Sequence, residues 1–152
     1  MRTLLLIAAL LAAGSAMVAR SSTPTELIES RQTNLKAIGK AMKSSAESFK
    51  SGAPDPALIR ANAMIIASYA DKLGTWFPAG TGMIAGGTIK TEARPEIWTD
   101  PAGFAKAAND FSIAAKAFGA AAEANDLSAT ATAMKTLGGT CKSCHESFRA
   151  KD

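Results

Sequence analysis

The sequence has a single histidine, His145, and only two cysteines, Cys141 and Cys144, among its 152 residues. A structural zinc site takes four ligands, so these three residues leave zinc one ligand short. A disulfide between cysteines only three positions apart would close a very small loop and stabilise the chain little. The strand-like alternation that surrounds a thioredoxin-type C-x-x-C is also missing. These absences exclude three common roles for paired cysteines.

The sequence also has few charged and aromatic residues, only a small excess of one sign of charge, and few long apolar runs. Charged residues make up 20% of the chain and aromatics 6%, and the formal net charge is only +4. So small an excess, without a basic stripe interleaved with aromatics, argues against nucleic acid as a partner. No catalytic triad, carboxylate pair or phosphate-binding loop is evident, so we do not expect an enzyme. Abundant alanine and the near absence of β-branched runs favour helices over strands.

The one dense cluster of reactive residues is Cys141-Lys142-Ser143-Cys144-His145, near the C-terminal end. It matches the C-x-x-C-H signature of c-type haem, in which two thiols add across the haem vinyl groups and the histidine binds the iron. On a helix, Cys141, Cys144 and His145 stand at i, i+3 and i+4 and project from one face. We therefore expect one haem c, covalently attached through Cys141 and Cys144, with His145 as the metal ligand.

Residues 1–19 have the pattern of a secretory signal peptide. Arg2 supplies a positive charge, residues 4–13 are an uncharged apolar run, and small residues follow, so we expect cleavage after about residue 16 or 19. The run is shorter than the about 20 apolar residues of a membrane helix, so no span remains after processing. Residues 20–152 then form one domain. Export agrees with the motif, because c-type haem is attached on the outer side of the bacterial membrane, and it predicts a periplasmic protein.

Four stretches of the mature chain repeat apolar residues at three- and four-residue steps, the period of an amphipathic helix. Hydroxyl or acidic caps followed by proline mark the starts of the first three. The predicted helices span residues 24–50, about 56–74, 101 to about 124 and about 128–149. Two short turns and one long loop join them, which predicts an all-α, antiparallel four-helix bundle with covalently bound haem c in its core.

The long loop, residues 75–99, loses the helical period and contains four glycines and two prolines. Trp76, Phe77 and Trp98 are expected to anchor it to the core. A loop of this length is usually functional or wraps something. Here we expect it to wrap the haem.

Three stretches spread over the mature chain carry a family resemblance. They are Arg31-Gln32 followed by Leu35, Ala-Arg-Pro-Glu-Ile-Trp-Thr-Asp at residues 93–100, and residues 141–149 with the attachment motif. Together they resemble the class II c-type cytochromes, and within them the cytochrome c′ family. The C-terminal motif separates this class from the commoner one that carries it near the N-terminus. The resemblance implies that Arg31, Gln32 and Glu92 lie near the haem edge and its propionates.

The iron position opposite His145 decides what such a haem does. The sequence has no second histidine. The remaining conventional ligands after signal removal are Met42, Met64, Met83 and Met134. The resemblance places Leu35 where low-spin relatives carry a methionine ligand, and leucine cannot bind iron. We therefore expect a five-coordinate haem, closed on its distal face by Leu35, that binds the diatomic gases NO and CO and has electron transfer capacity.

Two alternatives stay open at this point. In the first, a methionine such as Met42 ligates the iron and the protein is a low-spin electron carrier. In the second, the haem is chiefly structural in a partner-binding bundle. Small redox proteins or diatomic gases are the expected partners, and the resemblance permits a homodimer through the first two helices. Arg149, four residues after His145, either lies beside the proximal histidine or is a solvated cation at a helix end.

Overall fold

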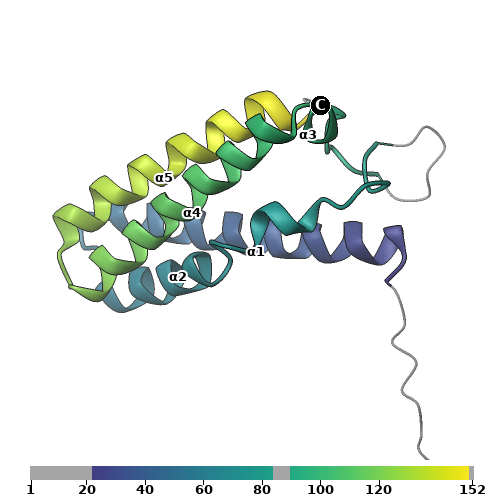
Figure 1. Cartoon of the computed structure of the whole chain (residues 1–152). Helices are drawn as coiled ribbons and strands as arrows, with labels where there is room; N and C mark the ends of the chain where they lie inside the picture. Colours follow the sequence, from purple (N-terminus) through teal and green to yellow (C-terminus); the bar gives the residue numbers. More distant parts are fainter. Residues whose placement is uncertain (1–21, 84–89, 151–152) are drawn as a thin grey trace, which may run out of the picture.

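The computed structural model describes residues 22–83 and 90–150, so the expected signal peptide lies outside the described residues. Four long helices dominate this part of the chain, with a single 3-10 turn and a one-turn helix between the second and third of them (Figure 1). The elements are α1 (Pro24–Lys50), α2 (Pro56–Ser68), η1 (Leu73–Trp76), α3 (Glu96–Thr99), α4 (Pro101–Glu123) and α5 (Leu127–Phe148). The predicted all-α four-helix bundle is confirmed. None of the described helices is both long enough and apolar enough to cross a membrane.

Side-chain caps start all four long helices, and the caps of the first three stand where the sequence predicted them. Thr23 and Glu26 form a capping box, in which the Thr23 hydroxyl accepts from the Glu26 amide at 3.2 Å and the Glu26 carboxylate accepts from the Thr23 amide at 2.7 Å. Asp55, Asp100 and Asp126 each accept hydrogen bonds from amides of the following first turn. Such caps satisfy amides that have no partner inside the helix. Because these interactions are local, the residue order alone locates them.

The predicted second helix, residues 56–74, is too long and is corrected here. α2 ends at Ser68, because the Tyr69 amide bonds to the Ile66 carbonyl at 3.1 Å and the chain turns more tightly. The buried Ala70 and Leu73 nevertheless continue the apolar pattern into η1. A tight turn and a helix can keep the same residues against the core, so periodicity alone does not separate them.

The predicted loop 75–99 contains helical turns at both ends that were not expected, since it begins within η1 and ends in α3. Trp98 serves as the anchor that the sequence suggested, because its indole nitrogen donates to the Phe77 carbonyl at 3.0 Å. Its ring also packs over Gly82, where an added Cβ would lie only 2.8 Å from the indole. Any larger residue at position 82 would displace Trp98.

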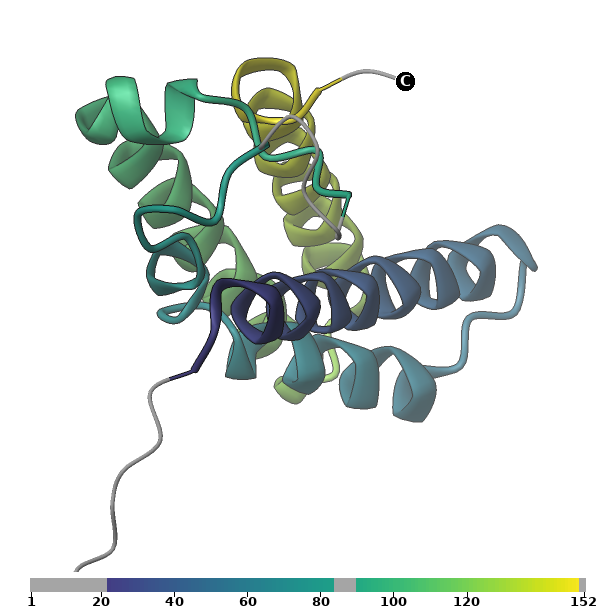
Figure 2. The same cartoon turned by 90° about the vertical axis from the view of Figure 1, so that its right-hand side faces the viewer.

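The helices pack as two pairs. α4 lies along α5, α1 lies along α2, and α2 joins the pairs by packing against α4 (Figures 1 and 2). The largest fully buried apolar side chains are Phe118, Ile59, Ile66 and Leu137. Both views place α3 at the end of the bundle where α1 begins and α5 ends. The segment that leads into α4 therefore lies at the same end as the cysteine motif.

Candidate haem-attachment site

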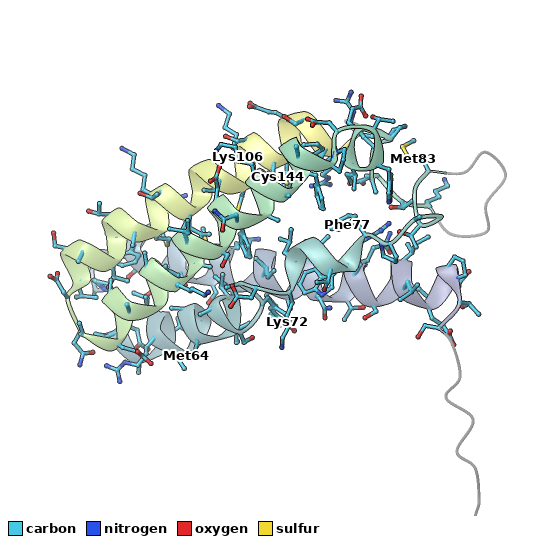
Figure 3. The ribbon with its side chains drawn as sticks, in the orientation of Figure 1. Met64, Lys72, Phe77, Met83, Lys106 and Cys144 are labelled. Carbon is cyan, nitrogen blue, oxygen red and sulfur yellow. The ribbon has the colours of Figure 1, made fainter. Side chains whose placement is uncertain are left out.

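The attachment motif occupies the last two turns of α5. Cys141 and Cys144 carry free thiols, are half-buried and pack against the central apolar core, whereas His145 is exposed. Figure 3 shows Cys144 among the side chains of the α4–α5 pair. The motif is helical, as the sequence predicted, and it places the two thiols and the imidazole on neighbouring positions of one helix.

Burial sets the protonation of the two thiols. It raises the pKa of Cys141, and burial together with the neighbouring Cys141 raises the pKa of Cys144. Both side chains are therefore protonated thiols at neutral pH. Such a pair fits the proposed attachment, in which each thiol adds across a vinyl group.

The imidazole of His145 is biased toward its neutral form. Desolvation by surrounding atoms lowers its pKa, the charge of Arg149 lowers it further, and the charge of Glu92 acts in the opposite direction. Only a neutral imidazole offers a nitrogen lone pair to a metal. The local charges thus favour the protonation state that an iron ligand requires.

Side chains of α1 contribute to the apolar core that Cys141 and Cys144 also contact. Leu35, Met42 and Phe49 recur every seven residues along α1, are half-buried and pack against the same core as Cys141 and Cys144. Leu35 is thus brought into the apolar cluster that holds the motif, although more than a hundred residues separate them in the sequence. An apolar core in contact with two attachment cysteines fits a porphyrin, which is a flat apolar ring.

The structure also narrows the set of methionines that qualify as iron ligands. Met64 and Met83 are 49% and 54% exposed, so neither lines the core. Met134 is packed against the core but lies on α5, eleven residues before His145, which corresponds to roughly 16 Å along the helix. A ligand on the opposite side of the iron has to come from another element, and Met42 on α1 is the methionine that meets this condition.

Arg31 is the most deeply buried charged side chain near this end of the bundle, with an exposed fraction of 2%. Its guanidinium donates to the Thr81 hydroxyl at 2.9 Å, the Thr81 carbonyl at 2.7 Å and the Thr91 hydroxyl at 2.8 Å. It also lies 4.6 Å from the centre of the Phe77 ring. Burial lowers its pKa, yet a guanidinium remains charged at neutral pH.

This buried cation has no carboxylate partner in residues 22–83 and 90–150. Buried charges are usually paired, because an isolated one is costly to desolvate. An anionic group beside Arg31 would balance its charge, and a haem propionate is such a group. The neighbouring Gln32 donates to the Lys90 carbonyl at 2.8 Å, so Arg31 and Gln32 both hold α1 to the connection between η1 and α3.

Replacement of Arg31 by alanine is expected to destabilise the protein by about 2–3 kcal/mol, because several buried acceptors lose a charged donor at once. Denaturant unfolding measured on the purified protein checks this value. Gln32→Ala is the matched control, since Gln32 is the next residue and makes one hydrogen bond, and about 1 kcal/mol is expected. Equal losses of unfolding free energy in the two variants would show that the contacts of Arg31 stabilise the protein no more than the single hydrogen bond of Gln32.

Glu92 and Arg149 meet although 57 residues separate them. The Arg149 side chain donates through Nε to a Glu92 carboxylate oxygen, and the Arg149 amide donates to the His145 carbonyl at 3.2 Å. The sequence suggested neither this pairing nor the roles of Thr81 and Thr91. Thr81, Thr91 and Glu92 belong to the segment between η1 and α3, where no repeating sequence pattern indicates a contact.

Figure 3 shows Phe77 between the α4–α5 pair and α1. Its ring meets Phe104 of α4 edge to face at 5.0 Å, and the same ring lies under the Arg31 guanidinium of α1. Phe104 in turn meets Phe148, three residues after His145, at 5.3 Å. A continuous set of aromatic contacts therefore links α1 to the turn of α5 that carries the candidate iron ligand.

Comparison with known proteins gives one consistent result. A family model described as Cytochrome C′ matches residues 26–149. A cytochrome c′ of Rhodospirillum rubrum is 35% identical over 150 residues, covering 99% of both chains, and one of Pararhodospirillum photometricum is 38% identical over 128 residues, covering 84% of this chain and 99% of its own.

Solved structures agree with these matches. The crystal structure of cytochrome c′ from Thermochromatium tepidum has a TM-score of 0.80 at 30% identity and covers 86% of this chain and 98% of its own. A ferrous variant of cytochrome c prime from Alcaligenes xylosoxidans with bound NO has a TM-score of 0.75 at 28% identity, covering 88% and 100%. A carbon monoxide-bound variant from the same organism has a TM-score of 0.74 at 28% identity, covering 87% and 100%.

Proposed function

This chain belongs to the cytochrome c′ family, and from that membership we propose that it is a periplasmic protein whose five-coordinate haem iron binds nitric oxide and carbon monoxide. Its cofactor is covalent haem c, for which Cys141 and Cys144 are the two attachment residues in the sequence. The observation that carries the proposal is the apolar side chain of Leu35 in the core cluster shared with the motif. The solved relatives with bound NO and CO support the same activity.

Each part of the site has a distinct task in this proposal. Bound haem supplies an iron that changes oxidation state and takes up small gases. Cys141 and Cys144 would hold the group covalently, and the neutral imidazole of His145 would supply the nitrogen ligand to its iron. Leu35 would place an apolar side chain against the haem, where it would exclude water and admit only ligands small enough to push it aside. Arg31 neutralises a propionate, since its buried charge lacks a carboxylate in the described part of the chain.

Electron transfer is part of the proposed function, with small redox proteins as the partners. The low-spin alternative requires a methionine on the Leu35 side of the iron, and the half-buried position of Met42 on α1 favours that residue. A methionine-to-iron charge-transfer band that disappears in Met42→Ala would be its signature. No catalytic reaction is included in the proposal.

The absorption spectrum of the reduced protein tests the proposal directly. Because leucine leaves the sixth position open, we expect a high-spin ferrous spectrum that changes when carbon monoxide is added. The measurement is a titration of the dithionite-reduced protein under carbon monoxide. A low-spin ferrous spectrum that carbon monoxide does not alter would contradict the proposal and favour methionine ligation.

Assembly and location complete the proposal. α2 exposes Leu58, Met64 and Ile65, with exposed fractions of 40%, 49% and 44%, which gives a second copy of the chain an apolar surface to cover. One structural relative, with a TM-score of 0.80, is described as a cytochrome c′ with ligand-controlled dimer dissociation. The proposed periplasmic location is supported by the signal-like sequence of residues 1–19 and by the chemistry of haem attachment.

A further inference from the structure

The chain leaving α5 is fastened to the segment before α3 by a short antiparallel bridge. This contact, which we call the C-terminal clasp, joins residues 92–94 to residues 148–150. Its backbone elements are the Ala93–Arg149 bridge, the Arg94 amide donating to the Phe148 carbonyl at 3.0 Å, and the Ala150 amide donating to the Glu92 carbonyl at 2.8 Å. Residues far apart in the sequence are thus held in register immediately after the attachment motif.

The clasp acts on the helical turn that carries His145. The Arg149 amide donates to the His145 carbonyl, so the hydrogen bond that closes the last turn of α5 belongs to a residue of the clasp. Phe148, the residue before Arg149, is only 8% exposed and packs against Phe104. The last turn of a helix frays when nothing holds it. The clasp restrains the last turn of α5, and the orientation of the His145 imidazole depends on that turn.

One ion pair closes the clasp on its outer side. The Arg149 and Glu92 side chains are 49% and 45% exposed. Pairs with such exposure contribute little to global stability, because water screens the attraction. The Glu92–Arg149 pair therefore adds little to the stability of the fold. Because it lies beside the proposed metal ligand His145, it is suited to orienting that side chain.

We propose that Glu92 is a positioning residue for the iron ligand. By holding the Arg149 side chain, Glu92 keeps the last turn of α5, and with it the His145 imidazole, in one orientation. This inference rests on the proposed role of His145 as the iron ligand. The family resemblance implied only that Glu92 lies near the haem propionates. The inference gives Glu92 a second role, which it performs through Arg149.

The test compares Glu92→Gln, which keeps the size of the side chain but removes its charge, with the wild type. Two readouts are used: hydrogen exchange of the Arg149 and Ala150 amides, and the iron–histidine stretching band in the resonance Raman spectrum of the ferrous protein. We expect exchange to accelerate about twofold to fivefold, as loss of a half-exposed pair implies, and the iron–histidine band to shift or broaden. Glu92→Asp should largely restore the wild-type band.

Asp110→Asn is the matched control, because Asp110 is also about 42% exposed and pairs with Lys106 on α4, outside the clasp. It should leave the iron–histidine band unchanged. A band that is the same in Glu92→Gln and wild type, whether or not exchange accelerates, would overturn the positioning role, as would equal effects of both variants. A wild-type ferrous protein with no iron–histidine band would instead contradict the proposed five-coordinate haem, so the two failures are distinguishable.

Discussion

Replacement of both Cys141 and Cys144 by alanine is expected to abolish covalent haem attachment and to leave the chain poorly folded. Both thiols are half-buried against the core, and the haem they hold should form part of that core. Loss of a group that supplies much of a core should cost about 5 kcal/mol or more, which is comparable to the total stability of a small domain. The measurements are haem retention after denaturation in acidified acetone and thermal unfolding followed by circular dichroism.

Lys142→Ala with Ser143→Ala provides the control, because it changes two residues within the same motif and leaves both thiols and His145 in place. Both control residues are exposed, so haem retention and unfolding temperature should stay near the wild-type values. Haem that survives acid acetone in the cysteine-free variant would refute thioether attachment. A cysteine-free variant that unfolds cooperatively without haem, near the wild-type temperature, would refute the role of the haem in the core.

Replacement of Leu35 by alanine is expected to raise the affinity of the ferrous protein for carbon monoxide by about 10- to 100-fold. In the proposed site the gas has to displace the leucine side chain from an apolar environment. Burying such a side chain is worth about 1.5–3 kcal/mol, and each 1.4 kcal/mol changes an equilibrium constant tenfold. Carbon monoxide titration of the reduced variant, followed by absorption, measures the change.

Met42→Ala is the informative comparison, since Met42 lies seven residues further along the same face of α1 and is also half-buried. If Leu35 covers the iron, Met42→Ala should change the affinity for carbon monoxide by less than about threefold, because it removes no group from the gas-binding side. A large gain in Met42→Ala, with none in Leu35→Ala, would identify methionine as the sixth ligand and exclude the proposed five-coordinate state.

The parts that could be predicted from the sequence are those set by short-range interactions. The first helix was predicted at residues 24–50 and spans Pro24–Lys50, because the Thr23–Glu26 capping box is complete within four residues. The third and fourth long helices end within one residue of their predicted limits. The bundle and the cytochrome c′ family were also predicted correctly, since the apolar repeat and the motifs persist over the mature chain.

The errors fall where distant residues decide the local conformation. The α2 helix stops at Ser68, although the apolar pattern runs on to Leu73, because the following turn keeps the same side chains buried. The turns at the two ends of the predicted loop 75–99, η1 and α3, were missed for a related reason: Trp98 and Phe77 hold each other in place across 21 residues. Propensities and periods read from neighbouring residues contain no information about such contacts.

The sequence by itself determined the cofactor and how it is attached, because Cys141, Cys144 and His145 are neighbours on one helix and their chemistry depends on that spacing alone. Only the tertiary structure decided the surroundings of this motif. It buried the Arg31 cation among Thr81, Thr91 and Phe77, and it joined Glu92 to Arg149 beside His145. These contacts cross 46 to 60 residues of chain and arise from the packing of the folded bundle, which the order of neighbouring residues does not encode.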